Sequence, residues 1–298
     1  MSVMETTKSI QNIKNKKGIR GFIKRNSKEI ITHIVLISVG MLFFFPFIWM
    51  LSTALKTPQE LIIVPPKLFP EVPQWSNFID AVTTIPFFLY LKNSMIIVSL
   101  SILGAIFSSS ITAYAFARLN WPGRDTWFII MLGTMMIPMQ VILIPMFVMY
   151  SKFGWLDTYL PLVLPMYFGG GQAFNIFLLK QFFRGTPKEL TESAVVDGAN
   201  HFYIFWKIML PLSKPALVTV ALFTFMSSWN DFFGPLIFIT SPEKSTLALG
   251  LRAFQSQFGG QFNLMLAAAI IVMTPTIIIF LLAQKQFIEG IKFSGIKG

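Results

Sequence analysis

The stretch GTPKELTESAVVDGANHFYIFWKIMLPLSKP, residues 185–215, differs sharply from the sequence on either side of it. The flanking sequence is apolar, whereas this stretch contains six charged side chains: Lys188, Glu189, Glu192, Asp197, Lys207 and Lys214. Its charges and its helix-forming residues suggest a structured polar connection between two apolar elements. The question is what such a connection would contact.

The rest of the composition is that of a membrane protein. Hydrophobic residues make up 54% of the 298 residues and charged residues 12%, about half of the charged fraction usual in soluble domains. Six regions are free of charge or nearly so: 30–55, 93–117, 126–151, 158–179, 215–242 (interrupted by Asp231) and 253–284. Each can supply the roughly 20 residues that a helix needs to cross a bilayer. We therefore predict an all-α integral membrane protein with six transmembrane helices.

The positive charges predict the orientation. If the N-terminus is cytoplasmic, 18 of the 24 lysines and arginines fall on the cytoplasmic side and six on the other. The positive-inside rule then places both termini in the cytoplasm. Residues 1–29 contain eight of these cations and are expected to form a basic cytoplasmic arm, followed by a transmembrane domain over 30–298. The net charge of +11 lies beside the spans, so it predicts contact with the lipid bilayer and no nucleic-acid partner.

Within residues 185–215, local signals predict two short helices. Thr186, Pro187 and Glu189 fit a capping box with proline at the first helical position. Gly198 would end this helix, and Asn200 would cap the second one. Taken alone, the residues leave two interpretations open: a docking surface for a partner protein, or an amphipathic hairpin lying among lipid headgroups.

The same stretch resembles the EAA loop of ABC importer permeases, whose pattern is roughly E-A-A, then D-G, then I-x-L-P. The matching residues are Glu192, Ser193, Ala194, Asp197, Gly198, Ile208, Leu210 and Pro211, with Ser193 standing where alanine is usual. Four further stretches resemble the carbohydrate importers of this family: AYAFARLNWPGR (113–124), MMIPMQVILIPMF (135–147), SSWNDFFGPLIF (227–238) and QKQFIEGIKFSGIKG (284–298). The last of these is similar to the tail of the second permease in maltose-type systems.

The resemblance implies a type I ABC importer permease fold in the bacterial cytoplasmic membrane. It implies a non-enzymatic permease subunit for a sugar or oligosaccharide that forms half of the pathway beside a second, homologous permease. Two ATPase subunits, which use ATP and Mg, would each grip one loop such as 185–215, and this chain itself would bind no cofactor. An extracellular or periplasmic solute-binding protein would contact the loop 241–262, including Gln257, Phe258, Gly259 and Gly260. The tail 285–298, with Gly295 and Lys297, would contact the ATPases.

Polar residues within the fifth predicted span are candidates for the substrate pathway. Trp229, Asn230 and Asp231 combine a ring, an amide and a carboxylate, the groups that bind sugars. The alternatives are a cap on a helix broken near Gly234, or a salt bridge to the second permease.

Other classes of protein are less well supported by the sequence. An ion-coupled secondary sugar transporter, the alternative function, would need acidic residues in several spans. A membrane enzyme would need a catalytic constellation, and the sequence shows none. His33 and His201 lack metal-ligand spacing, so no metal site is expected.

Overall fold

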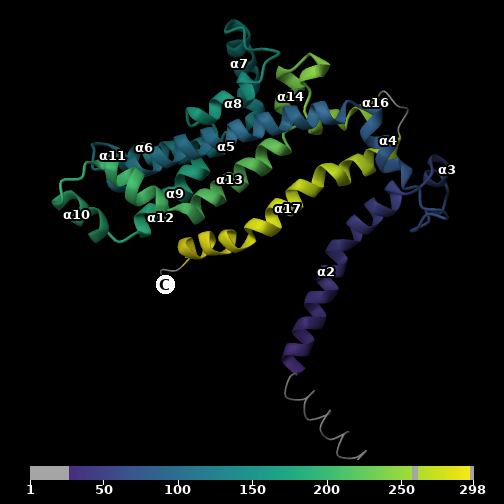
Figure 1. Ribbon diagram of the computed structural model, residues 1–298, viewed down its shortest axis with the longest axis horizontal. Helices are drawn as coiled ribbons and strands as arrows, with labels where there is room; N and C mark the ends of the chain where they lie inside the picture. The colour runs from purple at the N-terminus through teal and green to yellow at the C-terminus, as the bar shows by residue number, and fades with distance from the viewer. Residues whose placement is uncertain (1–26, 257–260, 296–298) are drawn as a thin grey trace, which may run out of the picture.

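The computed structural model describes residues 27–256 and 261–295, and every regular element in this part of the chain is helical (Figure 1). This confirms the all-α prediction. The elements are α2 (Ser27–Ala54), α3 (Pro58–Leu61), α4 (Ser76–Thr84), α5 (Phe87–Arg118), α6 (Arg124–Gly133), η1 (Thr134–Met136), α7 (Met139–Lys152), α8 (Leu160–Tyr167), α9 (Ala173–Gly185), α10 (Glu189–Val196), α11 (His201–Tyr203), the π-helical η2 (Ile204–Met209), α12 (Leu210–Leu212), α13 (Lys214–Trp229), α14 (Phe233–Phe238), η3 (Pro242–Lys244), α15 (Leu247–Gly250), α16 (Ala253–Ser256) and α17 (Phe262–Gly295).

Three described helices, α2, α5 and α17, are long and apolar enough to cross a membrane unaided. Two bent pairs could each make one further span: α6 and η1 with α7, bent by 97°, and α11–α12 with α13, bent by 77°. The predicted span 158–179 is divided between α8 and α9 by a turn in which Gly169 and Gly171 have positive φ. Six spans therefore remain a prediction, while at least three apolar spans are present.

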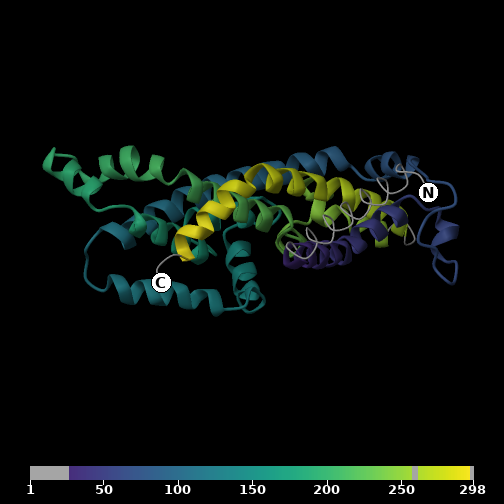
Figure 2. The ribbon, with the colours of Figure 1, turned by 90° about the horizontal axis from the view of Figure 1, so that it is seen from below.

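The unbroken helix α5 is the axis of the fold. It packs against α8, α9 and α13, and α13 packs in turn against α17. Gly104 allows α8 to approach closely, because a Cβ atom there would lie 2.5 Å from the ring of Tyr167. In both views, α10–α12 lie at one end of the molecule and α3 and α4 at the other (Figures 1 and 2).

Two hydrophobic cores lie along α5, one towards each end. The core towards α4 includes Phe225, Trp229, Phe254 and Leu264. The core towards α10 includes Phe183 of α9 and both Ile204 and Met209 of η2. Part of the polar 185–215 segment is thus integrated into the second core.

Helix α2 packs against α17, but most of its surface is left uncovered by the rest of the described chain. Its last turn is buried, whereas the apolar side chains before it are exposed on all sides, Phe43 by 72%. Figure 1 shows α2 directed away from α17. A helix that is apolar all round must be covered by lipid or by another membrane protein.

A cluster of polar contacts holds together the loop after α7 and the loop after α14. The carboxylate of Asp157 accepts hydrogen bonds from the backbone amides of Thr240 and Ser241, and it forms a salt bridge of 3.0 Å with Lys244. These contacts, and above all the Ser241 hydroxyl, hold the pKa of Asp157 well below its usual range. The carboxylate is therefore charged at neutral pH, and it joins the loop after α7 to the loop after α14.

The close approach at Gly104 can be tested with Gly104→Ala. The added methyl group must displace the Tyr167 ring, so we expect a loss of stability of about 1–3 kcal/mol, measured as a lower melting temperature of the detergent-purified protein. Gly133→Ala is the matched control, because nothing lies within 4 Å of a Cβ atom at that position. Equal melting temperatures for the two variants would contradict this view of the α5–α8 contact.

Candidate functional site

The turn after α10 is fixed by Gly198. Its φ is +84°, the left-handed conformation that closes many helices. The amide of Ala199 donates to the carbonyl of Ala194 at 2.9 Å, and the amide of Gly198 to that of Val195 at 3.0 Å. This pair of bonds is a Schellman motif, so the expected end of the first helix is confirmed.

The expected start of this helix is wrong. Lys188, not Thr186, occupies the N-cap position of α10, and no side chain caps the helix. Thr186 instead continues the end of α9: its hydroxyl donates to the carbonyl of Phe182 at 3.2 Å. Its own carbonyl accepts a hydrogen bond of 2.6 Å from Arg118. These two bonds hold Thr186 on α9 and leave it unable to begin the next helix.

The second helix begins as predicted, with Asn200 accepting a hydrogen bond from the amide of Tyr203 at 2.8 Å. It then widens into the π-helical turn η2, a form that occurs often at functional sites. Pro211 lies two residues beyond η2, in α12, and has no amide to donate to the carbonyl of Lys207. The helical ladder is therefore interrupted just before the chain bends by 77° into α13.

The residues that match the EAA pattern divide into two groups. Ala194 is buried in the core towards α10, and Ile208 and Leu210 are partly buried against it. The other five residues are exposed: Glu192, Ser193, Asp197, Gly198 and Pro211. One group therefore attaches the 185–215 segment to the helix bundle, and the other is available to a partner.

The exposed face of this segment is apolar as well as acidic. Val196 is 87% exposed and Phe202 72%, and the Trp206 ring lies 6.1 Å from that of Phe202 in a tilted arrangement. The exposed carboxylates of Glu192 and Asp197 lie on the same segment. A soluble surface rarely exposes such residues together, so this face has the properties of a docking surface.

The three candidate pathway residues occupy different environments. Trp229 is 2% exposed, stacks on Phe225 and donates from Nε1 to the carbonyl of Val272 at 3.0 Å. Asn230 is exposed and donates to the carbonyl of Met226, which lies one turn back on its own helix. Asp231 accepts a hydrogen bond of 3.0 Å from the amide of Gly234, at the break between α13 and α14. Asp231 also lines a small cavity of about 50 Å³ with Ser94, Ser227 and Thr246.

Some predicted contact residues cannot be placed. Gln257, Phe258, Gly259, Gly260 and Lys297 lie outside the described residues, and Gly295 is the last residue of α17. The start of the predicted loop 241–262 is ordered by packing: Asn93 of α5 donates to the carbonyls of Glu243 and Ser245, and the hydroxyl of Ser94 accepts from the amide of Leu247.

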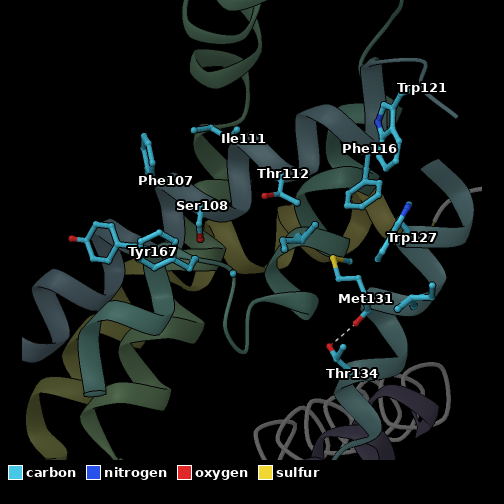
Figure 3. Close-up of a pocket in the computed structure, with 14 residues that line it drawn as sticks. Phe107, Ser108, Ile111, Thr112, Phe116, Trp121, Trp127, Met131, Thr134 and Tyr167 are labelled. Carbon is cyan, nitrogen blue, oxygen red and sulfur yellow. Dashed lines mark hydrogen bonds between the residues drawn. The ribbon is translucent and has the colours of Figure 1, made fainter. Parts of the chain in front are cut away.

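Two cavities between α5, α6 and α9 were not expected from the sequence. One is apolar, about 820 Å³ in volume, and Figure 3 shows Phe107, Ser108 and Tyr167 at one end and Phe116, Trp127 and Met131 at the other. The second is basic and about 890 Å³, and it lies where α5 and α9 approach α10. In the sequence, only the cations at the ends of successive apolar runs indicated the second cavity.

Comparison with known proteins shows the family of this chain. Residues 101–288 match the model of the family described as binding-protein-dependent transport system inner membrane component. The chain belongs to this family. It is thus a permease, the membrane component of a binding-protein-dependent transport system.

Two curated relatives and one solved structure are similar to this permease over most of its length. The arabinooligosaccharides transport system permease protein AraQ of Bacillus subtilis is 32% identical, covering 87% of this chain and 92% of the relative. The trehalose/maltose transport system permease protein MalG of Thermococcus litoralis is 33% identical, covering 91% and 98%. A chain in the crystal structure of a bacterial ABC transporter that imports the acidic polysaccharide alginate has a TM-score of 0.73 at 24% identity, covering 91% and 97%. That last likeness shows the shared fold.

Gly198→Val and Gly198→Asn together test the turn after α10. Nothing lies within 4 Å of a Cβ atom at Gly198, so the cost of substitution comes from the positive φ, which asparagine tolerates far better than a β-branched residue. We expect Gly198→Val to insert in the membrane and to lose most of its transport, while Gly198→Asn keeps most of it. Uptake by whole cells, normalised to permease content, is the measurement. Equal losses in the two variants would show that bulk, not conformation, matters there.

Proposed function

We propose that this permease is the transmembrane subunit of an ABC importer for a sugar or oligosaccharide. Its relatives from Bacillus subtilis and Thermococcus litoralis are named for arabinooligosaccharides and for trehalose and maltose, which supports a carbohydrate substrate. In this proposal the chain crosses the membrane six times. Both termini and the α10 end face the cytoplasm, and the α4 end faces outwards.

The observation that carries the proposal is the attachment of the 185–215 segment. Its inner residues share one hydrophobic core with α5, α9 and α13, and Arg118 of α5 donates to the carbonyls of both Phe183 and Thr186. A partner that moves the exposed face must therefore move the membrane helices with it. Such an element can carry the motion of an ATPase into the bilayer.

The remaining partners follow from the surfaces that the chain leaves uncovered. The apolar length of α2 is suited to a second permease, since one subunit forms half of the pathway. Two ATPase subunits would hold the ATP and Mg and grip the exposed face of the 185–215 segment. A solute-binding protein would meet the loops at the α4 end, including Gln257, Phe258, Gly259 and Gly260. Gly295 and Lys297 would lie near the ATPases.

The substrate pathway is proposed to pass the break between α13 and α14. Asn230 is exposed there, and Asp231, which accepts from the amide of Gly234, also lines the small cavity beside Ser94 and Ser227. The position of Trp229, buried and hydrogen-bonded to α17, favours a supporting role in which it holds the break in place. Asp231 acts as a cap on the broken helix, so any contact with sugar would be additional to that structural role.

Glu192→Lys tests the docking surface. Reversing an exposed charge where a partner docks should weaken ATPase attachment by roughly tenfold, measured as ATPase co-purified with the tagged permease. Glu189→Lys is the control, because both residues lie in the first turn of α10 and carry the same helix-dipole cost. Undiminished ATPase recovery with Glu192→Lys would remove this residue from the contact.

Asn230→Ala, Asp231→Asn and Asp231→Ala separate a pathway role from a packing role. Asparagine retains an oxygen that can accept from the amide of Gly234, whereas alanine does not. We expect Asn230→Ala and Asp231→Asn to assemble normally and to change the sugar concentration that gives half-maximal uptake, and Asp231→Ala to assemble poorly. Unchanged sugar dependence in both polar variants would leave Asp231 with its capping role alone.

A further inference from the structure

A basic pocket of about 890 Å³ opens at the α10 end of the permease. It is formed by the last turns of α5 and α9, the start of α6, and α10. Its charged lining consists of five cations and two carboxylates: Arg118, Arg124, Lys180, Arg184, Lys188, Asp125 and Glu192. The excess of positive charge is therefore concentrated on one concave surface.

Two of these cations already have partners within the protein. Arg118 donates to the carbonyls of Phe183 and Thr186, although its Nε is buried and makes no hydrogen bond in the described structure. Arg124 forms a salt bridge of 3.1 Å with Asp125. Neither of these cations requires a ligand to hold its position.

Lys180 is different. Lys180 is 7% exposed, and within the described part of the chain it forms no hydrogen bond or salt bridge, although the charge of the Asp125 carboxylate acts on it from beyond salt-bridge distance. Its ammonium group lies 3.1 Å from the centre of the Phe128 ring, a cation–π contact. A largely buried lysine that forms no close ion pair loses part of the hydration of its charge, and a ring face offsets only part of that loss. Together with the excess of cations in the lining, this favours an anion next to Lys180.

The apolar cavity of Figure 3 adjoins the basic pocket, because Phe116 lines both. On the side of α6 it is bounded by Trp127 and Met131, with Ile111 of α5 opposite. Ile129 lines the basic pocket and Ile130 the apolar cavity, and both side chains are exposed. A basic pocket that shares Phe116 with an open apolar groove of about 820 Å³ matches a molecule with a charged head and a hydrocarbon tail.

We propose that this pair of cavities binds an acidic phospholipid. The head phosphate lies between Lys180 and Arg184, and one acyl chain runs past Phe116 along Trp127 and Met131. Basic pockets between membrane helices are known to bind such headgroups. Inorganic phosphate would use the charges and leave the apolar cavity empty, and a neutral sugar would leave Lys180 without its counterion.

The test uses the assembled transporter, purified in a mild detergent and examined by native mass spectrometry with added phosphatidylglycerol or phosphatidylcholine. We expect the parent complex to bind phosphatidylglycerol in preference to phosphatidylcholine. The double variant Lys180→Met, Arg184→Gln keeps the apolar stems and removes two charges, so it should bind phosphatidylglycerol roughly 30-fold more weakly. Lys28→Gln removes an exposed cation at the start of α2 and should bind as the parent does.

Two further measurements distinguish a lipid headgroup from a free anion as the occupant of the basic pocket. Millimolar inorganic phosphate should not displace the lipid, and Met131→Trp, which fills the apolar cavity and leaves every charge in place, should weaken binding of phosphatidylglycerol. Equal binding by the parent and the double variant would overturn the proposal. Displacement by phosphate, together with unchanged binding by Met131→Trp, would also overturn it and assign the pocket to a free anion. Because lipid retention is read without transport, failure here is separate from failure of the proposed function.

Discussion

Polar side chains of α5 form hydrogen bonds with backbone groups at the points where neighbouring helices break or end. The rest of the structure depends on these hydrogen bonds. A backbone carbonyl or amide left unpaired in hydrocarbon costs several kcal/mol. Ser108 donates to the carbonyl of Met166 at the end of α8, and Arg118 donates to two carbonyls at the end of α9. In the chain around η3 and α15, Asn93 donates to two carbonyls and the hydroxyl of Ser94 accepts from the amide of Leu247. The breaks can exist because an unbroken helix lies beside them.

The same arrangement explains why the 185–215 segment is rigid where it meets the bundle and exposed where it does not. Arg118 fixes the end of α9, Gly198 fixes the turn after α10, and η2 buries Ile204 and Met209 in the shared core. The exposed residues between these points need no contact within the chain. Buried neighbours fix the positions of these exposed residues. A surface must be held in this way if it is to pass the motion of a partner to the membrane helices.

The sequence predicted the long helices well because a charge-free run of 20 residues has few structural alternatives: 30–55 and 93–117 correspond closely to α2 and α5. It did not predict where spans break. The 97° bend before Pro138 and the turn through Gly169 and Gly171 depend on neighbours that satisfy the freed backbone. The capping box at Thr186 failed for a related reason, since Arg118, 68 residues away, competes for that residue. The basic and apolar cavities were also missed, because they form between helices distant in sequence.

Helix α13 connects the two regions for which a function is proposed. It begins at Lys214, directly after α12 of the 185–215 segment, and it ends at Trp229, next to Asp231. Its start shares the core towards α10 through Ala216 and Val220, and its end shares the core towards α4 through Phe225 and Trp229. A rotation of the 185–215 segment that is passed on through the 77° bend after α12 therefore reaches the break at Asp231 along one continuous helix, α13. Because Trp229 is hydrogen-bonded to the carbonyl of Val272, the same rotation must either carry α17 with it or break that bond.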